Sequence, residues 1–309
     1  MNRTFQNAWV VSLTHFDRDG GLDEQAMRTH LLRLADAGQN VYAGSTNIGE
    51  GFSLDDKELH RVLSVAAETL KGRIGIRAGG REARSVSEAL ATIRIAKDAG
   101  VEAIHLFQLD VGHGSSKPDA GELERFYCQV LERCDLPVIL SNYPKLGYAV
   151  PVDLIARLTE RFPQIIGMRD SGGDTAYLTD LLSRLGGRLE ISTVGVRAML
   201  PALFLGADTV MTTEANVAPA LVTSVMEAFH AGKMRSLREH YAALVSLHLA
   251  LNRYGGSGGR GMKPLLDNLG LMGGALRQPR RGISDQDAEA LLHAVRLLDL
   301  EEFRELVAT

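Results

Sequence analysis

The stretch FPQIIGMRDSGG, residues 162–173, is the most informative part of the sequence for the fold. It is an apolar run that ends in Arg169 and Asp170, followed by a serine and two glycines. A short apolar run that is bounded by turn residues predicts a buried strand, and it places the two charged residues at the carboxyl end of that strand. A charged side chain at such an end indicates a ligand site.

Seven further apolar runs alternate with longer amphipathic segments. The eight strand candidates are residues 9–14, 41–45, 73–79, 102–107, 137–142, 165–169, 190–195 and 208–213. Segments 22–38 and 86–100 are typical of the intervening helices, since apolar residues recur at helical spacing and each segment ends at a glycine. Pro151, Asp153 and Asp174 mark the starts of two later helices.

Strand–helix alternation with short loops implies parallel strands joined by right-handed crossovers. Eight such units within residues 1–225 favour an α/β fold, a (β/α)8 TIM barrel. An open doubly wound sheet fits less well, because the first strand leads into THFDRDGG (14–21) and not into a G-x-G-x-x-G fingerprint.

Residues 226–309 contain no strand candidate and predict a C-terminal helical region after the barrel. Within it, YGGSGGRGMKP (254–264) departs from the Walker phosphate loop, because Met262 separates Gly261 from Lys263 and a proline follows. We therefore expect a flexible loop between helices at this point.

Composition and charge restrict the class of protein. The chain has 309 residues, a formal net charge of −4 and no basic run, which makes nucleic acid a poor partner. The amino-terminal apolar run is too short for a signal peptide or a membrane span, and no other segment reaches the length of a span. We expect a cytoplasmic protein without a membrane partner.

The carboxyl ends of barrel strands carry the chemistry of this fold class, which supplies candidate residues. The candidates are His15 after the first strand; Gly44, Ser45, Thr46 and Glu50 after the second; Ser141, Tyr143 and Lys145 around the end of the fifth; Arg169 on the sixth; and Asn216 after the eighth. The glycines and hydroxyls after the second strand are suited to a small carboxylate. The planar fork of Arg169 suits a carboxylate or phosphate, while a structural ion pair is the alternative. His15, Asp110 and His113 have no metal-ligand spacing, so no metal is expected.

Several motifs together resemble the dihydrodipicolinate synthase / N-acetylneuraminate lyase superfamily of class I aldolases. They are VVSLTHFDRDGGLD (10–23), AGSTNIGEGFSLDDKE (43–58), LPVILSNYP (136–144), IIGMRDSGGD (165–174), GADTVMTTEANVAP (206–219), KPLLDNLGL (263–271) and LRQP (276–279). The resemblance covers almost the whole chain. It implies a TIM barrel, action on small 2-oxo acids, no cofactor and a homo-oligomer, a tetramer or a dimer.

The resemblance also implies a Schiff-base lysine on the sixth strand, and this sequence has Arg169 at that position. A guanidinium stays protonated and cannot form an imine. The tyrosine of the family's fifth strand falls at Ser141, with Tyr143 two residues later, and the arginine that comes after it falls at Leu146. The tyrosine pair after the fourth strand falls at Gln108 and Leu109.

Three interpretations remain open. The first is a carbon–carbon or carbon–oxygen lyase that acts on a small 2-oxo or hydroxy carboxylic acid without the lysine imine. Its catalytic candidates are Arg169, Tyr143, Ser141 and His15, and its substrate-binding candidates are Gly44, Ser45, Thr46, Glu50, Lys145 and Asn216. The second is a Schiff-base aldolase that uses Lys145 in place of the missing lysine. The third is a non-catalytic carboxylate-binding or regulatory protein.

Overall fold

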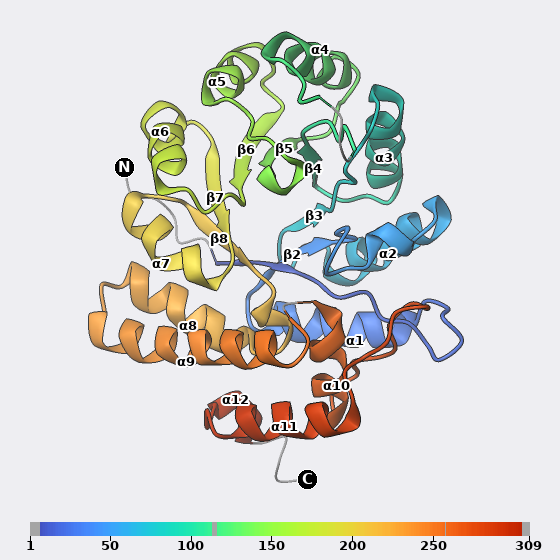
Figure 1. The fold of residues 1–309 in the computed structure, drawn as a ribbon, viewed down its shortest axis with the longest axis vertical. Coiled ribbons are helices and arrows are strands. Elements are labelled where there is room, and N and C mark those ends of the chain that lie inside the picture. The colour runs from blue at the N-terminus through green and yellow to red at the C-terminus, as the bar shows by residue number, and fades with distance from the viewer. Residues whose placement is uncertain (1–6, 113–115, 257, 305–309) are drawn as a thin grey trace.

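The computed structural model describes residues 7–112, 116–256 and 258–304. Eight parallel strands form a closed barrel in sequence order, and helices surround it (Figure 1). The strands are β1 (Trp9–Val11), β2 (Asn40–Ala43), β3 (Ile76–Ala78), β4 (Ala103–Phe107), β5 (Val138–Asn142), β6 (Ile165–Asp170), β7 (Glu190–Val194) and β8 (Thr209–Thr212). Each overlaps a predicted strand, and the (β/α)8 TIM barrel is confirmed.

The helices on the outside of the barrel come after the strands one by one. They are α1 (Glu24–Asp36), α2 (Asp56–Leu70), α3 (Val86–Asp98), α4 (Ala120–Leu131), α5 (Val152–Arg161), α6 (Thr175–Leu185), α7 (Val196–Leu205) and α8 (Pro219–His230). Three short 3-10 turns are η1 (Gly51–Ser53), η2 (Pro144–Leu146) and η3 (Glu214–Asn216). Asp174 caps α6 through its side chain and Pro151 precedes α5, so both predicted starts are confirmed.

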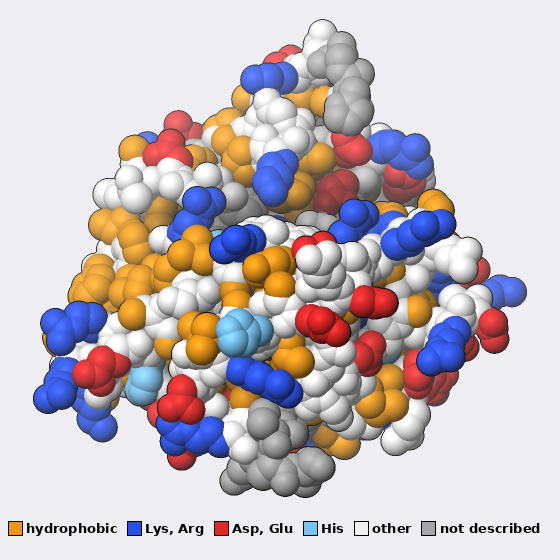
Figure 2. All heavy atoms as spheres, turned by 60° about the horizontal axis from the view of Figure 1, so that its bottom comes forward, with side chains coloured by type: hydrophobic (Ala, Val, Ile, Leu, Met, Phe, Trp, Pro, Cys, Tyr) orange, Lys and Arg blue, Asp and Glu red, His pale blue; other side chains and the backbone are white. Residues whose placement is uncertain are grey.

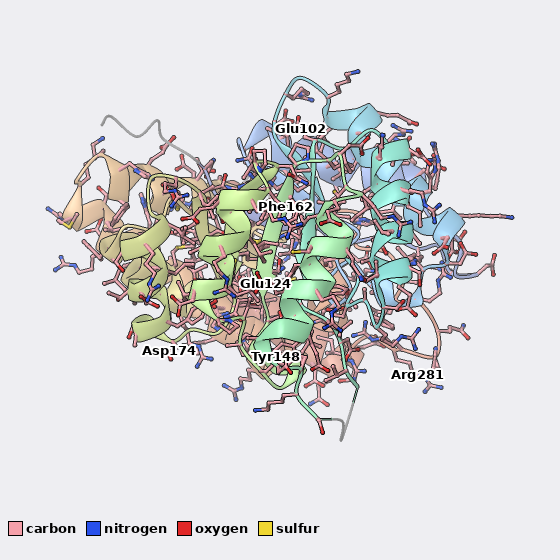
Figure 3. The ribbon with its side chains drawn as sticks, turned by 90° about the horizontal axis from the view of Figure 1, so that it is seen from above. Glu102, Glu124, Tyr148, Phe162, Asp174 and Arg281 are labelled. Atoms are coloured by element: carbon pink, nitrogen blue, oxygen red, sulfur yellow. The ribbon has the colours of Figure 1, made fainter. Side chains whose placement is uncertain are left out.

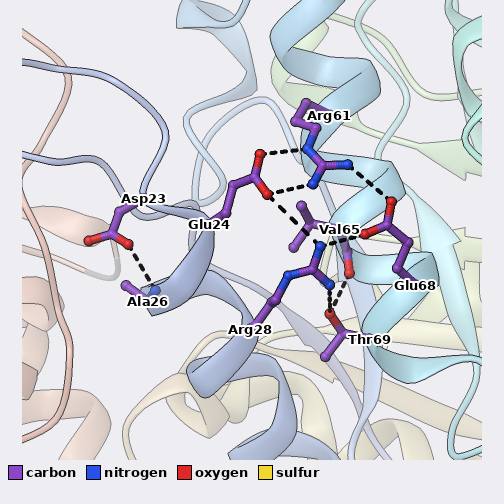
Figure 4. A network of polar contacts seen from close by, with 8 residues as sticks. All are labelled: Asp23, Glu24, Ala26, Arg28, Arg61, Val65, Glu68 and Thr69. Carbon is purple, nitrogen blue, oxygen red and sulfur yellow. Dashed lines mark hydrogen bonds and ion pairs between the residues drawn. The ribbon is translucent and has the colours of Figure 1, made fainter.

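Neighbouring helices are also joined by charges on their outer faces. Between α1 and α2, Arg61 bonds both oxygens of Glu24 at 2.5 Å and Glu68 at 3.0 Å, and Arg28 pairs with Glu68 (Figure 4). These groups are partly exposed, so each pair contributes about 0.2–1 kcal/mol. The network aligns two helices that already pack on the barrel.

After α8 the chain continues as α9 (Met234–Arg253), α10 (Gly259–Asn268), α11 (Asp285–Arg296) and α12 (Glu301–Arg304), which lie together at one side of the barrel (Figure 1). The prediction of a loop over residues 254–264 is wrong in its second half, because α10 begins at Gly259 and buries Met262 and Lys263. The boundary predicted between residues 225 and 226 falls inside α8. The division into barrel and appendage stays a prediction.

The two ends of the barrel carry different sets of loops. Figure 3 shows Glu102 and Phe162, which precede β4 and β6, at one end, and Tyr148 and Asp174, which come after β5 and β6, at the other. The carboxyl ends of the strands therefore share one face, where the candidate residues were expected. On the face drawn in Figure 2, basic and acidic side chains are interspersed, in keeping with the small net charge. Across the described residues, no helix is long and apolar enough to cross a membrane.

Candidate active site

A cavity of about 710 Å³ opens at the carboxyl ends of the strands. Its lining comes from most of the strand ends. The lining residues that bear on its chemistry are Tyr42, Ser45, Thr46, Glu82, Phe107, Tyr143, Lys145, Arg169, Asp170, Thr213 and His248. Five of the ten predicted site residues are among them, namely Arg169, Tyr143, Ser45, Thr46 and Lys145.

Arg169 lies near the end of β6, paired in register with Ser141 on β5 and Ser192 on β7. Its guanidinium lies 5.0 Å from the ring centroid of Phe107 and 5.8 Å from that of Tyr42. Its Nη1 donates a long hydrogen bond of 3.4 Å to the Tyr42 hydroxyl, and its Nε has no partner within the described chain. The side chain is thus enclosed by aromatic faces, and its charge is directed to the cavity.

A second buried arginine provides a contrast within the same barrel. Arg77 on β3 binds Glu190 through two hydrogen bonds of 2.7 and 2.9 Å and packs over the Trp9 ring. Arg169 is equally buried, with 7% of its surface exposed, but no ion pair joins it to a carboxylate among the described residues. A buried charge without a counterion is costly, so this environment favours the arrival of an anion.

Two tyrosines and one glutamate line the cavity together with Arg169. Burial raises the pKa of Tyr42 to about 12, although the charge of Arg169 opposes the shift. Burial and the charge of Glu82 also raise the pKa of Tyr143. Both phenols are therefore protonated near neutral pH and can donate. Glu82 comes after β3, accepts a 2.6 Å hydrogen bond from the Thr46 hydroxyl, and lines the cavity.

The loop after β2 is held by its own hydrogen bonds. Gly44 has φ +67°, and a side chain there would meet Leu59 at 2.8 Å, so this turn needs a glycine. The Ser45 hydroxyl accepts from the backbone N–H of Gly49 at 2.9 Å, and Thr46 donates to Glu82. Ser45 and Thr46 line the cavity, while Gly44 supplies the backbone conformation that places them.

The turn after β5 carries Tyr143 and Lys145 to the cavity. Buried Gln108 braces it, since its amide accepts from the Tyr143 N–H at 2.9 Å and donates to the carbonyl oxygens of Tyr143 and Tyr148 at 2.9 and 3.0 Å. The Tyr143 ring packs edge-on against Phe107 with centroids 5.8 Å apart. Lys145 is exposed, with Nζ 5.9 Å from the Tyr143 ring centroid.

Five other candidates lie outside the cavity lining, among them Gly44. Ser141 is fully buried and contacts His105, with Oγ and Nδ1 3.3 Å apart. His15 is fully buried, with its ring 4.9 Å from that of His30. Burial, helped by the charge of Lys263, lowers the pKa of His15 to about 3, which keeps the ring neutral.

Glu50 and Asn216 are also enclosed by protein. Glu50 has no exposed surface and accepts a 2.7 Å hydrogen bond from buried Lys263 of α10. Asn216 bonds the Leu13 N–H at 3.1 Å and the Val11 carbonyl at 2.8 Å, and so ties the turn after β8 to β1. Neither side chain borders the cavity.

Three residues of the cavity lining, Glu82, Tyr42 and His248, were not among the predicted site residues. Tyr42 lies within a predicted strand, one residue before the end of β2, so its position near a strand end could have identified it. Glu82 comes after the third strand in the same way as the candidates chosen elsewhere, and His248 belongs to a long helix whose position no local pattern indicates. For metals, no cluster of three or more His, Cys, Asp or Glu side chains occurs among the described residues, and His113 lies outside them.

Comparison with known proteins identifies the family. Residues 4–297 match the model of the Dihydrodipicolinate synthetase family. The chain is 30% identical over 300 residues to the 4-hydroxy-tetrahydrodipicolinate synthase of Thiobacillus denitrificans, covering 96% of this chain and 98% of that one. It is 28% identical over 294 residues to the enzyme of that name from Acidithiobacillus ferrooxidans, covering 94% and 98%.

Solved structures of proteins with this family's name have the same fold as this chain. The chloride-inhibited dihydrodipicolinate synthase of Acinetobacter baumannii, complexed with pyruvate, superposes with a TM-score of 0.84 at 27% identity, covering 96% of this chain and 99% of that one. A dihydrodipicolinate synthase from Bacillus anthracis gives a TM-score of 0.85 at 22% identity, covering 95% and 98%, which supports the fold alone. The family model spans the barrel together with most of the C-terminal helices, and on that match this chain belongs to the dihydrodipicolinate synthetase family, within the class I aldolase superfamily of lyases.

Proposed function

We propose that this protein is a lyase that makes or breaks a carbon–carbon or carbon–oxygen bond in a small 2-oxo or hydroxy carboxylic acid, without a lysine imine. The observation that carries the proposal is Arg169, a buried cation in the cavity lining with no carboxylate partner among the described residues. Membership of an aldolase family supports the reaction class.

The chemistry of a guanidinium fits binding and electrostatic stabilisation. Arg169 cannot lose a proton to become a nucleophile, but its fork can bind a carboxylate and the neighbouring carbonyl oxygen together. Negative charge that develops on that oxygen as an adjacent bond breaks would be stabilised in place. In this proposal the intermediate that holds the electron pair of the broken bond is the enolate of a 2-oxo acid, whereas in the Schiff-base route it is an enamine.

Proton transfer at the substrate is assigned to groups beside the fork. Tyr143 is protonated and is positioned by Gln108 and Phe107, so it can donate to carbon or oxygen. Glu82 faces the same space and can accept a proton. Ser45 and Thr46 supply hydrogen bonds to the substrate, and Ser141, His15, Glu50 and Asn216 support the site from outside the cavity.

The test of this proposal is ligand stabilisation followed by turnover. We expect pyruvate and longer 2-oxo acids to raise the melting temperature of the wild-type protein, and Arg169→Ala to abolish the shift. Arg188→Ala, an exposed arginine at the other end of the barrel, is the matched control and should respond as wild type does. An unchanged shift in Arg169→Ala removes this residue from the site, and ligands that bind but never react favour a regulatory protein.

Lys145 favours a second candidate function, an imine aldolase with a relocated lysine, because it is the one lysine in the cavity lining that the structure describes. Borohydride reduction in the presence of pyruvate, followed by peptide mass spectrometry, separates the two. We expect no adduct on any lysine. A reduced adduct on Lys145 that disappears in Lys145→Arg would replace our first proposal with this one.

The assembly and location of the protein are taken from the family in this proposal. We propose a cytoplasmic homo-oligomer, a tetramer or a dimer, that needs no cofactor. Light scattering after size-exclusion chromatography measures the assembly, and a monomer at micromolar concentration would contradict it.

A further inference from the structure

A histidine–carboxylate pair lies at the cavity wall beside the end of β8. Glu214 lies in η3, directly after β8, and His248 lies on α9. The His248 Nδ1 is 2.7 Å from the Glu214 Oε1. The two residues come from different elements, and neither has a part in the proposed lyase site around Arg169.

Glu214 is held as an ionised acceptor. It is 1% exposed, and its Oε2 accepts from the Thr212 hydroxyl at 2.6 Å and the Thr213 N–H at 3.1 Å. Burial alone would raise its pKa, but the hydrogen bonds from His248 and Thr212 outweigh burial and lower it. A carboxylate only accepts hydrogen bonds, so the proton of the imidazole must lie on Nδ1.

The other ring nitrogen is therefore a base. With Nδ1 donating to Glu214, neutral His248 carries a lone pair on Nε2. The Asn252 Nδ2 is 3.2 Å from Nδ1 and 3.1 Å from Nε2, so it lies over the ring face and not in the ring plane. It donates to the His248 carbonyl at 2.7 Å. The His248 side chain is 16% exposed and borders the cavity.

The cavity joins this base to Arg169. Strands β6, β7 and β8 are consecutive in the barrel, and Thr213 lines the wall together with His248. Arg169 lines the same cavity, so a hydroxy acid whose carboxylate and carbonyl bind Arg169 can extend within this cavity toward His248.

We propose that His248 is a general base for the hydroxyl of a bound 4-hydroxy-2-oxo acid, and that Glu214 is its positioning residue. The inference rests on the proposed lyase function. The Nε2 lone pair takes the hydroxyl proton, the C4–O bond becomes a carbonyl, and the C3–C4 bond breaks. Its electron pair forms the enolate whose oxygen lies at Arg169. Protonation at C3 then gives the 2-oxo acid, and in the reverse direction the imidazolium returns its proton to the new hydroxyl.

Other charged groups line the same cavity as His248. They are Asp170 and Asp174 from the end of β6 and the loop after it, and Arg197 from α7.

The test separates cleavage from exchange. The probes are 4-hydroxy-2-oxopentanoate, followed by release of acetaldehyde and pyruvate, and pyruvate in D₂O, followed by loss of the methyl proton signal in NMR. We choose His248→Asn because its amide can still donate to Glu214, with His248→Gln as a second variant and His60→Gln, an exposed histidine on α2, as the control. Thermal melting verifies that each variant folds.

We expect His248→Asn to reduce kcat for cleavage by about 10²–10⁴-fold with little change in KM, and to retain proton exchange and pyruvate stabilisation. Glu214→Gln should reduce kcat by at least about 10-fold with little change in KM, as expected of a residue that positions the base. If Arg169→Ala loses both proton exchange and pyruvate stabilisation while the His248 variants keep them, then Arg169 binds the 2-oxo acid and His248 acts only in cleavage. Equal cleavage by wild type and both His248 variants overturns the inference, as does a wild type that exchanges pyruvate protons but does not cleave the probe. A wild type that neither binds nor exchanges pyruvate defeats the proposed function itself.

Discussion

The role of a buried arginine in this barrel depends on its neighbours. Arg77 has Glu190 and Trp9 as partners, so its charge is compensated and its role is structural. Arg169 has aromatic faces and a tyrosine hydroxyl, which contact the guanidinium without neutralising it. The same type of side chain is thus an internal ion-pair partner at one strand and, in our proposal, an anion-binding group at another.

His15 was also predicted as a catalytic residue, but it is buried in the core and does not line the cavity. Its pKa of about 3 in the fold lies below the ordinary 6.5, so between these values the unfolded chain binds a proton that the folded chain does not. Stability from this group is therefore present above about pH 6.5 and is lost as the pH falls toward 3.

We predict that His15→Leu flattens the pH dependence of stability. The slope of the free energy of unfolding against pH, measured by urea titration between pH 4 and 6, should decrease by up to about 1.4 kcal/mol per pH unit. His60→Gln, at an exposed position, should keep the wild-type slope. Parallel slopes for wild type and His15→Leu would refute the assignment.

At the scale of elements, strand ends and close backbone approaches shape the cavity rim. The turn after β3 passes so near β4 that a Cβ on Gly80 would lie 1.9 Å from the His105 carbonyl oxygen. This approach brings the nearby Glu82 to the Thr46 hydroxyl. A glycine is required here for space and not for a positive φ.

We predict that Gly80→Ala destabilises the protein and disturbs the site. The new methyl group would clash with the backbone of His105, which can move only at a cost in free energy. We therefore expect the free energy of unfolding to fall by about 1–3 kcal/mol and pyruvate to stabilise the variant less than the wild type. Gly258→Ala is the matched control, because nothing lies within 4 Å of its Cβ position and its φ is −92°. A wild-type melting temperature for Gly80→Ala would show that β3 and β4 separate without cost.

At the scale of the whole molecule, the C-terminal helices complete the barrel mouth. Lys263 of α10 is fully buried and binds Glu50 and the Ala275 carbonyl, each at 2.7 Å. Glu50 belongs to the loop that carries Ser45 and Thr46, and Arg280 lies 3.5 Å from its other oxygen. Burial lowers the pKa of Lys263, while the charge of Glu50 opposes this. The ion pair therefore couples the C-terminal helices to the loop after β2.

We predict that Lys263→Met destabilises the protein by roughly 3 kcal/mol, because it leaves the Glu50 carboxylate buried with the backbone N–H of Arg277 and the more distant Arg280 as its partners. The double variant Lys263→Met/Glu50→Gln should recover part of the loss, since no charge is then left buried. Lys233→Met, an exposed lysine, is the control. Urea titration measures all three, and a single variant no less stable than the double would contradict the coupling.

The barrel and the position of Arg169 on its sixth strand could be predicted from the order of residues along the chain. Strand–helix alternation, helix starts such as Asp174 and the order of the strands are local patterns, and local patterns can be read along the chain. The candidates Tyr143, Ser45, Thr46 and Lys145 came from the rule that strand ends share one face.

Which buried charges are compensated could not be predicted in this way, because it depends on contacts between segments that are far apart in the chain. Glu50 and Lys263 are 213 residues apart, and no spacing rule joins them. The pairing of Glu214 with His248 depends on how α9 crosses the end of β8. The lack of an ion pair at Arg169 depends on the neighbouring strands, which place no carboxylate within reach of it among the described residues. Burial and partnership belong to contacts between distant segments, and these exist only once the chain has closed the barrel and packed its last helices against it.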